Sequence, residues 1–177
     1  MKKYLAVLLA AAMVFALAGC GSKDAGTDEK SEGVMTYEEY MAAPLDSEVV
    51  IETYVQAKQS WWDNQATVYS QDKDGAYFLY NMACSEEDYE KLVPGTKIKV
   101  TGYKSEWSGE VEVTDAVFEI EDGSYVAEAE DVTSLLGTDE LIGHQNEFVA
   151  FKGMTVEDSG DGAAFLYSWD GSGSDGD

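Results

Sequence analysis

The chain has 177 residues, and 35 acidic residues against 11 lysines and no arginine give it a formal net charge of -24. Affinity for nucleic acid depends mainly on neutralising phosphates, so we do not expect so acidic a chain to bind DNA or RNA. With 45% hydrophobic and 12% aromatic residues, the chain can bury a core, and its length predicts one domain or slightly more.

Residues 1–19 have the features of an export signal. Lys2 and Lys3 precede the apolar run 4–17, which is too short for a stable membrane-spanning helix. The run ends in the sequence LAGC at residues 17–20. This sequence resembles the lipobox of bacterial lipoproteins, and the resemblance implies that Cys20 is acylated and becomes the first mature residue. The alternative is an ordinary secretory signal in which Cys20 is incidental.

Acylation at Cys20 would anchor the mature protein to the cell membrane, on the extracytoplasmic face. Residues 21–33 contain no apolar residue larger than alanine, so residues 20–35 are predicted to be a flexible tether. With Cys20 acylated, Cys84 has no cysteine partner. It follows an apolar run, which favours a buried structural cysteine over a reactive thiol.

The folded part is expected to begin with a short helix at Thr36–Met41, with a capping box formed by Thr36 and Glu39 and an end before Pro44. A second capping box at Ser85–Asp88 predicts another short helix, through residue 92. Period-two alternation of apolar residues predicts strands. The first strand has five residues on one face: Val49, Ile51, Thr53, Val55 and Ala57. The other strands are predicted at 66–70, 76–82, 97–102, 110–113 and 116–120.

Three strands, a short helix and further strands form the order of the OB-fold, a five-stranded Greek-key barrel. Residues 92–102 (LVPGTKIKVTG) are similar to the passage from the helix to strand four in bacterial OB-fold modules. The resemblance places Gly102 where that strand bends. We therefore predict an all-β fold with a short helix, with an OB-fold-like barrel over residues 36–126. An SH3-like barrel or an open sandwich is the alternative.

An internal repeat extends this prediction. The sequence DGAYFLY at residues 74–80 recurs as DGAAFLY at residues 161–167, with one difference. Residues 127–177 are therefore expected to be an incomplete second OB-like repeat, ending in a tail rich in Gly, Ser and Asp. The whole chain resembles the tandem OB-fold lipoproteins of anaerobic Firmicutes. That resemblance implies a fold and a location, but no activity.

Neither a catalytic site nor a metal site is expected. His144 is the only histidine, and no Gly-x-Ser-x-Gly motif accompanies it. One histidine and a distant cysteine do not supply the three or four ligands of a zinc site. Residues 170–177 and 72–75 carry alternating oxygen ligands, but both lack the twelfth-position glutamate of a calcium loop. We therefore predict no enzymatic activity and no cofactor.

Aromatic residues are the remaining candidates for a binding site: Trp61 and Trp62 after the first strand, Tyr69 and Tyr77 on the next two strands, and Trp107 before the last. The face of strands two and three of an OB-fold binds oligonucleotides or oligosaccharides. Two adjacent tryptophans cannot both point into one core from one strand, so at least one should cover a barrel end or be exposed. The alternative is that both plug the barrel.

These observations predict a membrane-anchored extracytoplasmic binding or adaptor module that takes a glycan or a peptide on its aromatic face. The alternative is a structural protein that interacts with other envelope proteins and binds no small ligand.

Overall fold

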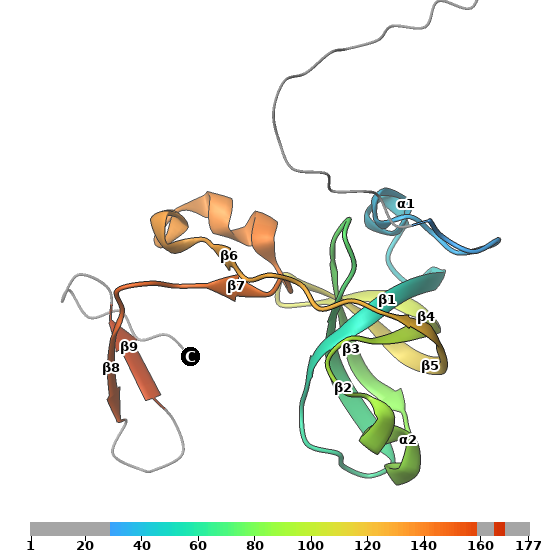
Figure 1. Ribbon diagram of the computed structural model, residues 1–177. Helices are drawn as coiled ribbons and strands as arrows, with labels where there is room; N and C mark the ends of the chain where they lie inside the picture. Colours follow the sequence, from blue (N-terminus) through green and yellow to red (C-terminus); the bar gives the residue numbers. More distant parts are fainter. Residues whose placement is uncertain (1–28, 159–164, 169–177) are drawn as a thin grey trace, which may run out of the picture.

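The computed structural model describes residues 29–158 and 165–168. The expected signal segment, Cys20 and the C-terminal tail lie outside these residues. The described part is mostly β-structure with a few short helices (Figure 1). Its elements are α1 (Tyr37–Ala42), β1 (Glu48–Lys58), β2 (Gln65–Gln71), β3 (Ala76–Ala83), α2 (Glu86–Lys91), β4 (Thr96–Trp107), β5 (Glu110–Ser124), β6 (Glu130–Asp131), η1 (Thr133–Leu135), η2 (Asp139–His144), β7 (Val149–Ala150), β8 (Thr155–Asp158) and β9 (Phe165–Ser168). None of the helices in these ranges has the length and apolar character needed to span a bilayer.

Strands β1 to β5 close into a barrel in the order β1-β2-β3-β5-β4, and β4 pairs with β1 to complete it. The pairs are antiparallel except for β3 and β5, which run parallel. Helix α2 lies between β3 and β4 in the chain. The predicted β-rich fold with a five-stranded barrel and short helices is therefore confirmed.

Both short helices begin at the predicted caps. The Thr36 hydroxyl accepts a hydrogen bond from the Glu39 backbone at 3.2 Å, and the Glu39 carboxylate accepts one from the Thr36 backbone at 2.9 Å. At the other end of α1, the buried ammonium of Lys104 on β4 donates to three main-chain carbonyls, those of Tyr40, Met41 and Ala43. The last carbonyls of a helix lack the full set of partners that carbonyls inside a helix have, so Lys104 satisfies them and fixes α1 to the barrel.

Strand β5 is one strand, where the sequence predicted two at residues 110–113 and 116–120. Thr114 and Asp115 separate the two predicted strands. Asp115 has φ 48°, and aspartate tolerates this left-handed backbone better than most residues. The strand therefore bends without ending. The register with β4 shifts opposite the bend, at Gly102. A Cβ atom at Gly102 would lie 2.7 Å from a Val113 methyl and 2.8 Å from the Thr114 carbonyl oxygen. Gly102 thus occupies a strand bend, as predicted.

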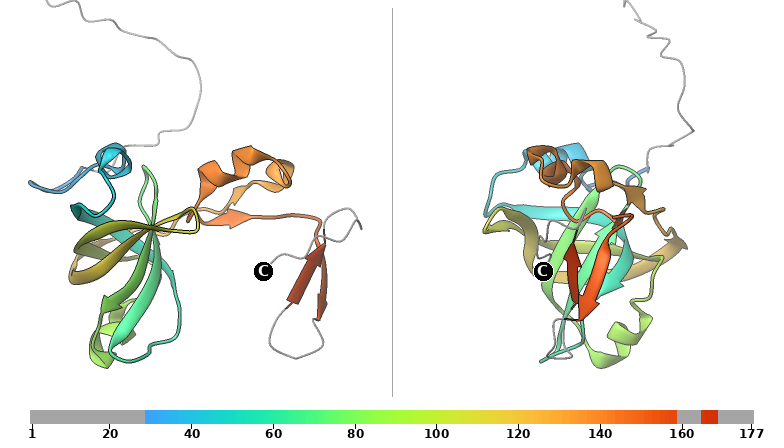
Figure 2. Two further views of the ribbon diagram at one scale, coloured as in Figure 1. Left: turned by 180° about the vertical axis from the view of Figure 1, so that it is seen from behind. Right: turned by 90° about the vertical axis from the view of Figure 1, so that its left-hand side faces the viewer.

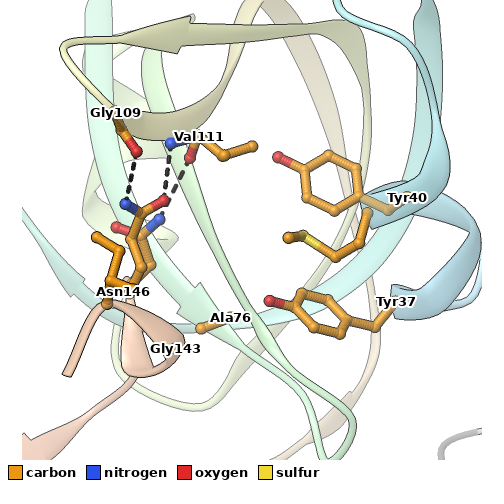
Figure 3. A pocket seen from close by; sticks show the side chains of 10 residues that line it. Tyr37, Tyr40, Ala76, Gly109, Val111, Gly143 and Asn146 are labelled. Atoms are coloured by element: carbon orange, nitrogen blue, oxygen red, sulfur yellow. Dashed lines mark hydrogen bonds between the residues drawn. The ribbon is translucent and has the colours of Figure 1, made fainter. Parts of the chain in front are cut away.

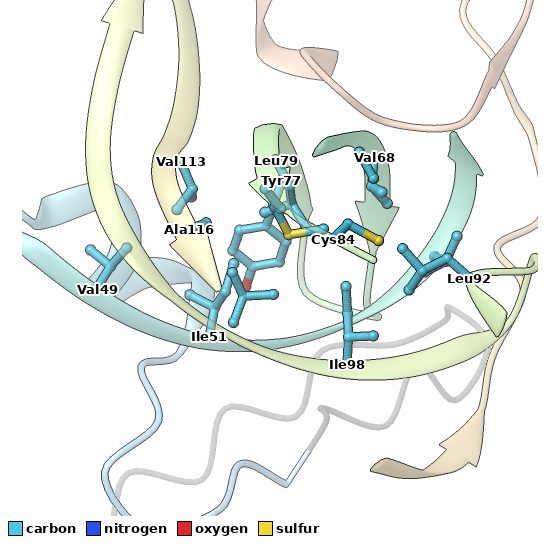
Figure 4. Packing of buried hydrophobic residues seen from close by; sticks show 14 of the residues in the cluster. Val49, Ile51, Val68, Tyr77, Leu79, Cys84, Leu92, Ile98, Val113 and Ala116 are labelled. Atoms are coloured by element: carbon cyan, nitrogen blue, oxygen red, sulfur yellow. The ribbon is translucent and has the colours of Figure 1, made fainter. Parts of the chain in front are cut away.

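The interior of the barrel is filled by alternate residues of the strands, joined by Leu92 after α2 (Figure 4). Ala57 was expected on this inner face, but it is exposed. A β-bulge between Val55 and Ala57 shifts the register, and an extra residue in one strand changes the face that follows. Cys84 is buried in this core, as predicted.

Residues 30–35 contact the barrel, although the sequence placed them in the tether. The Lys30 ammonium lies 2.6 Å from Oδ2 of Asp72 and donates to the Glu52 carbonyl at 3.0 Å. Met35 donates its backbone N–H to the Val50 carbonyl at 2.8 Å. Composition suggested a tether because residues 21–33 contain no apolar residue larger than alanine, but composition could not show that Lys30 pairs with a buried carboxylate.

The second part forms two small sheets: β6 pairs parallel with β7, and β8 pairs antiparallel with β9. Figure 2 shows the second part extending from one side of the barrel, with β8 and β9 farthest away. Strand β9 carries residues 165–167 of the repeated motif, whereas residues 161–164 lie outside the described ranges. No second barrel is formed by the described residues, so the second repeat stays a prediction.

Polar side chains attach this second part to the barrel (Figure 3). Gln145 accepts a hydrogen bond from the Val111 backbone at 2.8 Å and donates to a carbonyl of the β4–β5 turn at 2.9 Å. Asn146 donates to the Val111 carbonyl at 3.2 Å. The Phe148 backbone donates to the Gln71 side chain at 2.7 Å. The segment after η2 is therefore held against β2 and the start of β5.

Candidate binding face

Three aromatic rings form a row on the outer face of β2 and β3, although the middle ring, Phe78, is only 6% exposed. Tyr69 pairs with Phe78 across the two strands, and their ring centroids lie 5.0 Å apart. Phe78 lies 6.0 Å from Tyr80, which is 44% exposed. The sequence singled out Tyr69 but missed Phe78 and Tyr80. The only signal for them was the alternation of AYFLYNM, which does not say which of its two faces points outward.

Tyr77 is not part of this row. The strand register pairs Tyr77 with Ser70 and Phe78 with Tyr69, so Tyr77 and Tyr69 lie on opposite faces of the sheet. Tyr77 is fully buried, and its hydroxyl donates to Oδ2 of Asp72 at 3.0 Å. A ring without exposed surface cannot stack on a ligand, so Tyr77 is corrected from a candidate binding residue to a core residue.

The two adjacent tryptophans of the β1–β2 loop point to different environments. Trp61 is partly buried, and its indole N–H donates to the Cys84 carbonyl at 3.0 Å. Trp62 is 78% exposed. This division agrees with the expectation that both rings cannot enter one core. Trp62 therefore remains available for binding, whereas Trp61 helps to cover the barrel.

Trp107 is 73% exposed but lies far along the barrel from Trp62. Trp107 pairs with Glu110 at the β4–β5 turn. The part of β5 that follows this turn lies beside the first residues of β3. Trp62 is instead bridged to Gln65, which pairs with the last residue of β3. The structure therefore does not bring the two exposed tryptophans together; they lie at opposite ends of the β2–β3 face.

A polar hollow of about 320 Å³ lies near the Trp62 end of this face. Its wall includes Asp63, Asn64, Asn81 and Asp115, all of which have positive φ values, between 48° and 59°. Asparagine and aspartate adopt this backbone most easily, and here it gathers short amide and carboxylate side chains around one hollow. Exposed rings adjoin it in sequence, because Trp62 precedes Asp63 and Tyr80 precedes Asn81.

The face is acidic as well as aromatic. Glu112 on β5 pairs with Phe78 and is almost fully buried. Burial raises the pKa of its carboxyl group, and the charge of Glu110 raises that pKa further. The raised pKa shows that further negative charge is unfavourable here, and together with the net charge of -24 this disfavours an anionic ligand at this face.

One group of described residues could supply three metal ligands: Glu130, His144 and Glu147, whose ligand atoms lie within 4.8 Å of one another. Nδ1 of His144 is 2.8 Å from a Glu147 carboxylate oxygen. Two ligands on a tetrahedral zinc ion lie about 3.3 Å apart, given bonds of about 2.0 Å. The shorter observed distance is that of a hydrogen bond, so we assign this contact to holding the end of η2.

No protein-family model matches the chain, and no curated protein matches it. The functional assignment therefore depends on the residues and their geometry.

Proposed function

We propose that this protein is a membrane-anchored, extracytoplasmic binding lipoprotein with an OB-fold-like barrel, and that it binds a neutral glycan near Trp62. The strand order β1-β2-β3-β5-β4, the parallel β3–β5 pair and the position of α2 between β3 and β4 support the OB-fold assignment. The lipobox-like sequence ending in Cys20 supports the anchor.

The observation that carries the ligand assignment is that two exposed rings, Trp62 and Tyr80, each directly precede a residue that lines the polar hollow. Trp62 and Tyr80 present apolar ring surface, and Asn64, Asn81 and Asp63 line the adjoining hollow. A sugar ring has apolar C–H faces that stack on aromatic rings, and its hydroxyls bond to amides and carboxylates. A neutral glycan therefore suits both features, whereas an anionic polymer would be repelled by the carboxylates.

Replacing either exposed ring should weaken glycan binding. The chain from residue 21 onward keeps every described residue and suits this measurement. We expect it to bind neutral oligosaccharides on a glycan array, including β-1,4-linked N-acetylhexosamines. Trp62→Ala and Tyr80→Ala should each raise the dissociation constant at least tenfold, a loss of about 1.4 kcal/mol, because stacking surface is removed.

Trp107→Ala is the matched control, because Trp107 is 73% exposed but lies at the opposite end of the β2–β3 face from Trp62. It should leave binding unchanged. An array without a bound neutral glycan, or an equal loss in the control, would contradict the proposal. The structural alternative, a protein that contacts other envelope proteins, would then be favoured.

The anchor has its own test. Cys20→Ala should remove the acylation site, so the protein should be recovered in the soluble extracytoplasmic fraction or the medium instead of the membrane fraction. Metabolic labelling with a palmitate analogue should mark the unchanged protein and not the variant. A variant that still carries the label would show that Cys20 is not the acylated residue.

A further inference from the structure

A cavity of about 200 Å³ lies where α1 and the start of β3 meet the β4–β5 turn and the end of η2. Figure 3 shows the hydroxyls of Tyr37 and Tyr40 pointing from α1 into this space. Met41, Val111 and Ile142 contribute apolar surface to its wall. The cavity therefore has apolar walls and a polar edge formed by two tyrosine hydroxyls.

Tyr40 carries an unpaired polar group into this cavity. Its side chain is 1% exposed, and its hydroxyl has no hydrogen-bond partner among the described residues. Buried hydroxyls without a partner cost free energy and are rare in folded proteins. Tyr77 is a direct comparison, because its ring lies 5.0 Å from that of Tyr40, is equally buried, and donates its hydroxyl to Asp72.

The wall opposite Tyr40 is held in place by its own hydrogen bonds. The Gln145 amide is used by the backbone of Gly109 and Val111, and the Asn146 amide donates to Val111 (Figure 3). This wall is therefore preformed, and neither side chain is turned to the Tyr40 hydroxyl. The Tyr40 hydroxyl is buried and points toward the cavity (Figure 3), so a molecule that fills the cavity is the candidate for its missing partner.

Size and charge restrict what can fill it. A protein cavity of roughly 150 Å³ is large enough for benzene, whereas pockets for drug-sized ligands begin at about 300 Å³. Burial raises the pKa of Tyr40, with smaller effects from Tyr37 and Glu112. Burial also raises the pKa of Tyr37, and the charges of Glu147 and Asp72 raise it further. The hydroxyls therefore stay protonated as donors, and the surrounding negative charge disfavours an anion.

We propose that this cavity is a binding site for a small uncharged cyclic molecule that carries an acceptor oxygen, such as a ring alcohol or a cyclic ketone. The ring lies against Met41, Val111 and Ile142, and its oxygen accepts the hydrogen bond of the Tyr40 hydroxyl. The site is separate from the proposed glycan face and does not depend on it.

Cyclohexanone, cyclohexanol and phenol are suitable probes, with benzene as the oxygen-free control and benzoate as the anionic control. Binding is measured by protein-detected NMR titration of the chain from residue 21 onward. The three oxygen-bearing probes should shift the resonances of residues around the cavity and should bind more tightly than benzene, whereas benzoate should not bind. Trp62→Ala should leave this binding unchanged, which separates the cavity from the glycan face.

Two isosteric variants test the role of the hydroxyl. Tyr40→Phe should weaken binding of the oxygen-bearing probes by about threefold to tenfold and leave benzene unaffected. It should also raise the unfolding temperature of the ligand-free protein by a few degrees, because it removes an unpaired buried hydroxyl. Tyr77→Phe should lower the unfolding temperature, because it breaks a bond to Asp72.

The opposite results would overturn the proposal. If no oxygen-bearing probe binds, the cavity holds water only. If Tyr40→Phe binds all the probes as the unchanged protein does, the Tyr40 hydroxyl does not select the ligand. A lower unfolding temperature for Tyr40→Phe would show that its hydroxyl is already paired in the free protein.

Discussion

Replacing Asp72 by alanine is expected to lower the free energy of unfolding by about 3–5 kcal/mol, the usual cost of removing one partner of a buried ion pair. The Asp72 carboxylate is fully buried and lies 2.6 Å from the Lys30 ammonium, whose side chain is itself largely buried. It also accepts hydrogen bonds from the Tyr77 hydroxyl, at 3.0 Å, and from the backbone N–H groups of Asp74 and Gly75. Alanine would leave all of these donors without their partner.

Two controls separate charge from hydrogen bonding at Asp72. Asp72→Asn keeps an acceptor oxygen for the turn but loses the charge opposite Lys30, so it should destabilise less than alanine does. Asp122→Ala removes an exposed carboxylate of β5 and should change stability by less than about 0.5 kcal/mol. Urea unfolding at pH 7 gives all three values. Equal stability of Asp72→Ala and Asp122→Ala would mean that the Lys30–Asp72 pair contributes nothing.

The strands of the barrel could be predicted from the sequence because their side chains alternate at period two between core and solvent. The helix caps could be predicted because Thr36 and Ser85 act locally, on backbone groups three residues away. The extent of β5 could not be predicted in the same way. The Thr114–Asp115 pair resembles a turn in sequence, and only the partner strand shows that the backbone continues through it.

The binding residues were harder to predict because the pattern of a strand does not fix which face is buried. Tyr69 and Tyr77 both belong to alternating strands, but their relative faces depend on the register set by the turn at Asp72–Gly75. A shift of one residue exchanges the two faces, which is why Tyr77 was chosen although its ring faces the core, and Tyr80 was missed.

The cavity depends on contacts between distant parts of the chain. Gln145 and Asn146 reach the β4–β5 turn across more than thirty residues of sequence, with separations of 34 to 36 residues. Nothing in their local sequence distinguishes them from other polar loop residues. The unpaired hydroxyl of Tyr40 is likewise a property of its neighbours and not of the helix that carries it.

Alkaline pH is expected to unfold the protein steeply, with a loss of about 2.7 kcal/mol of stability for each pH unit above 10, which is about 1.36 kcal/mol for each of two buried tyrosines. Burial raises the pKa of Tyr40 above its ordinary value of 10.0, and Tyr37 and Glu112 add to the effect. Burial raises the pKa of Tyr77 as well. The charge of Asp72 and the hydrogen bond to Asp72 raise this pKa further.

The direction of this dependence follows from counting protons. In the unfolded chain both tyrosines ionise near pH 10, whereas in the folded barrel they keep their protons, so the folded state binds more protons and loses stability as pH rises. The stabilisation is complete below pH 10 and disappears towards the higher folded pKa values. Urea unfolding between pH 9 and 11.5, followed by circular dichroism, measures the slope. Tyr40→Phe should reduce the slope by about 1.36 kcal/mol for each pH unit, because one titrating group is then absent; an unchanged slope in this variant would mean that Tyr40 ionises as readily in the folded barrel as in the unfolded chain.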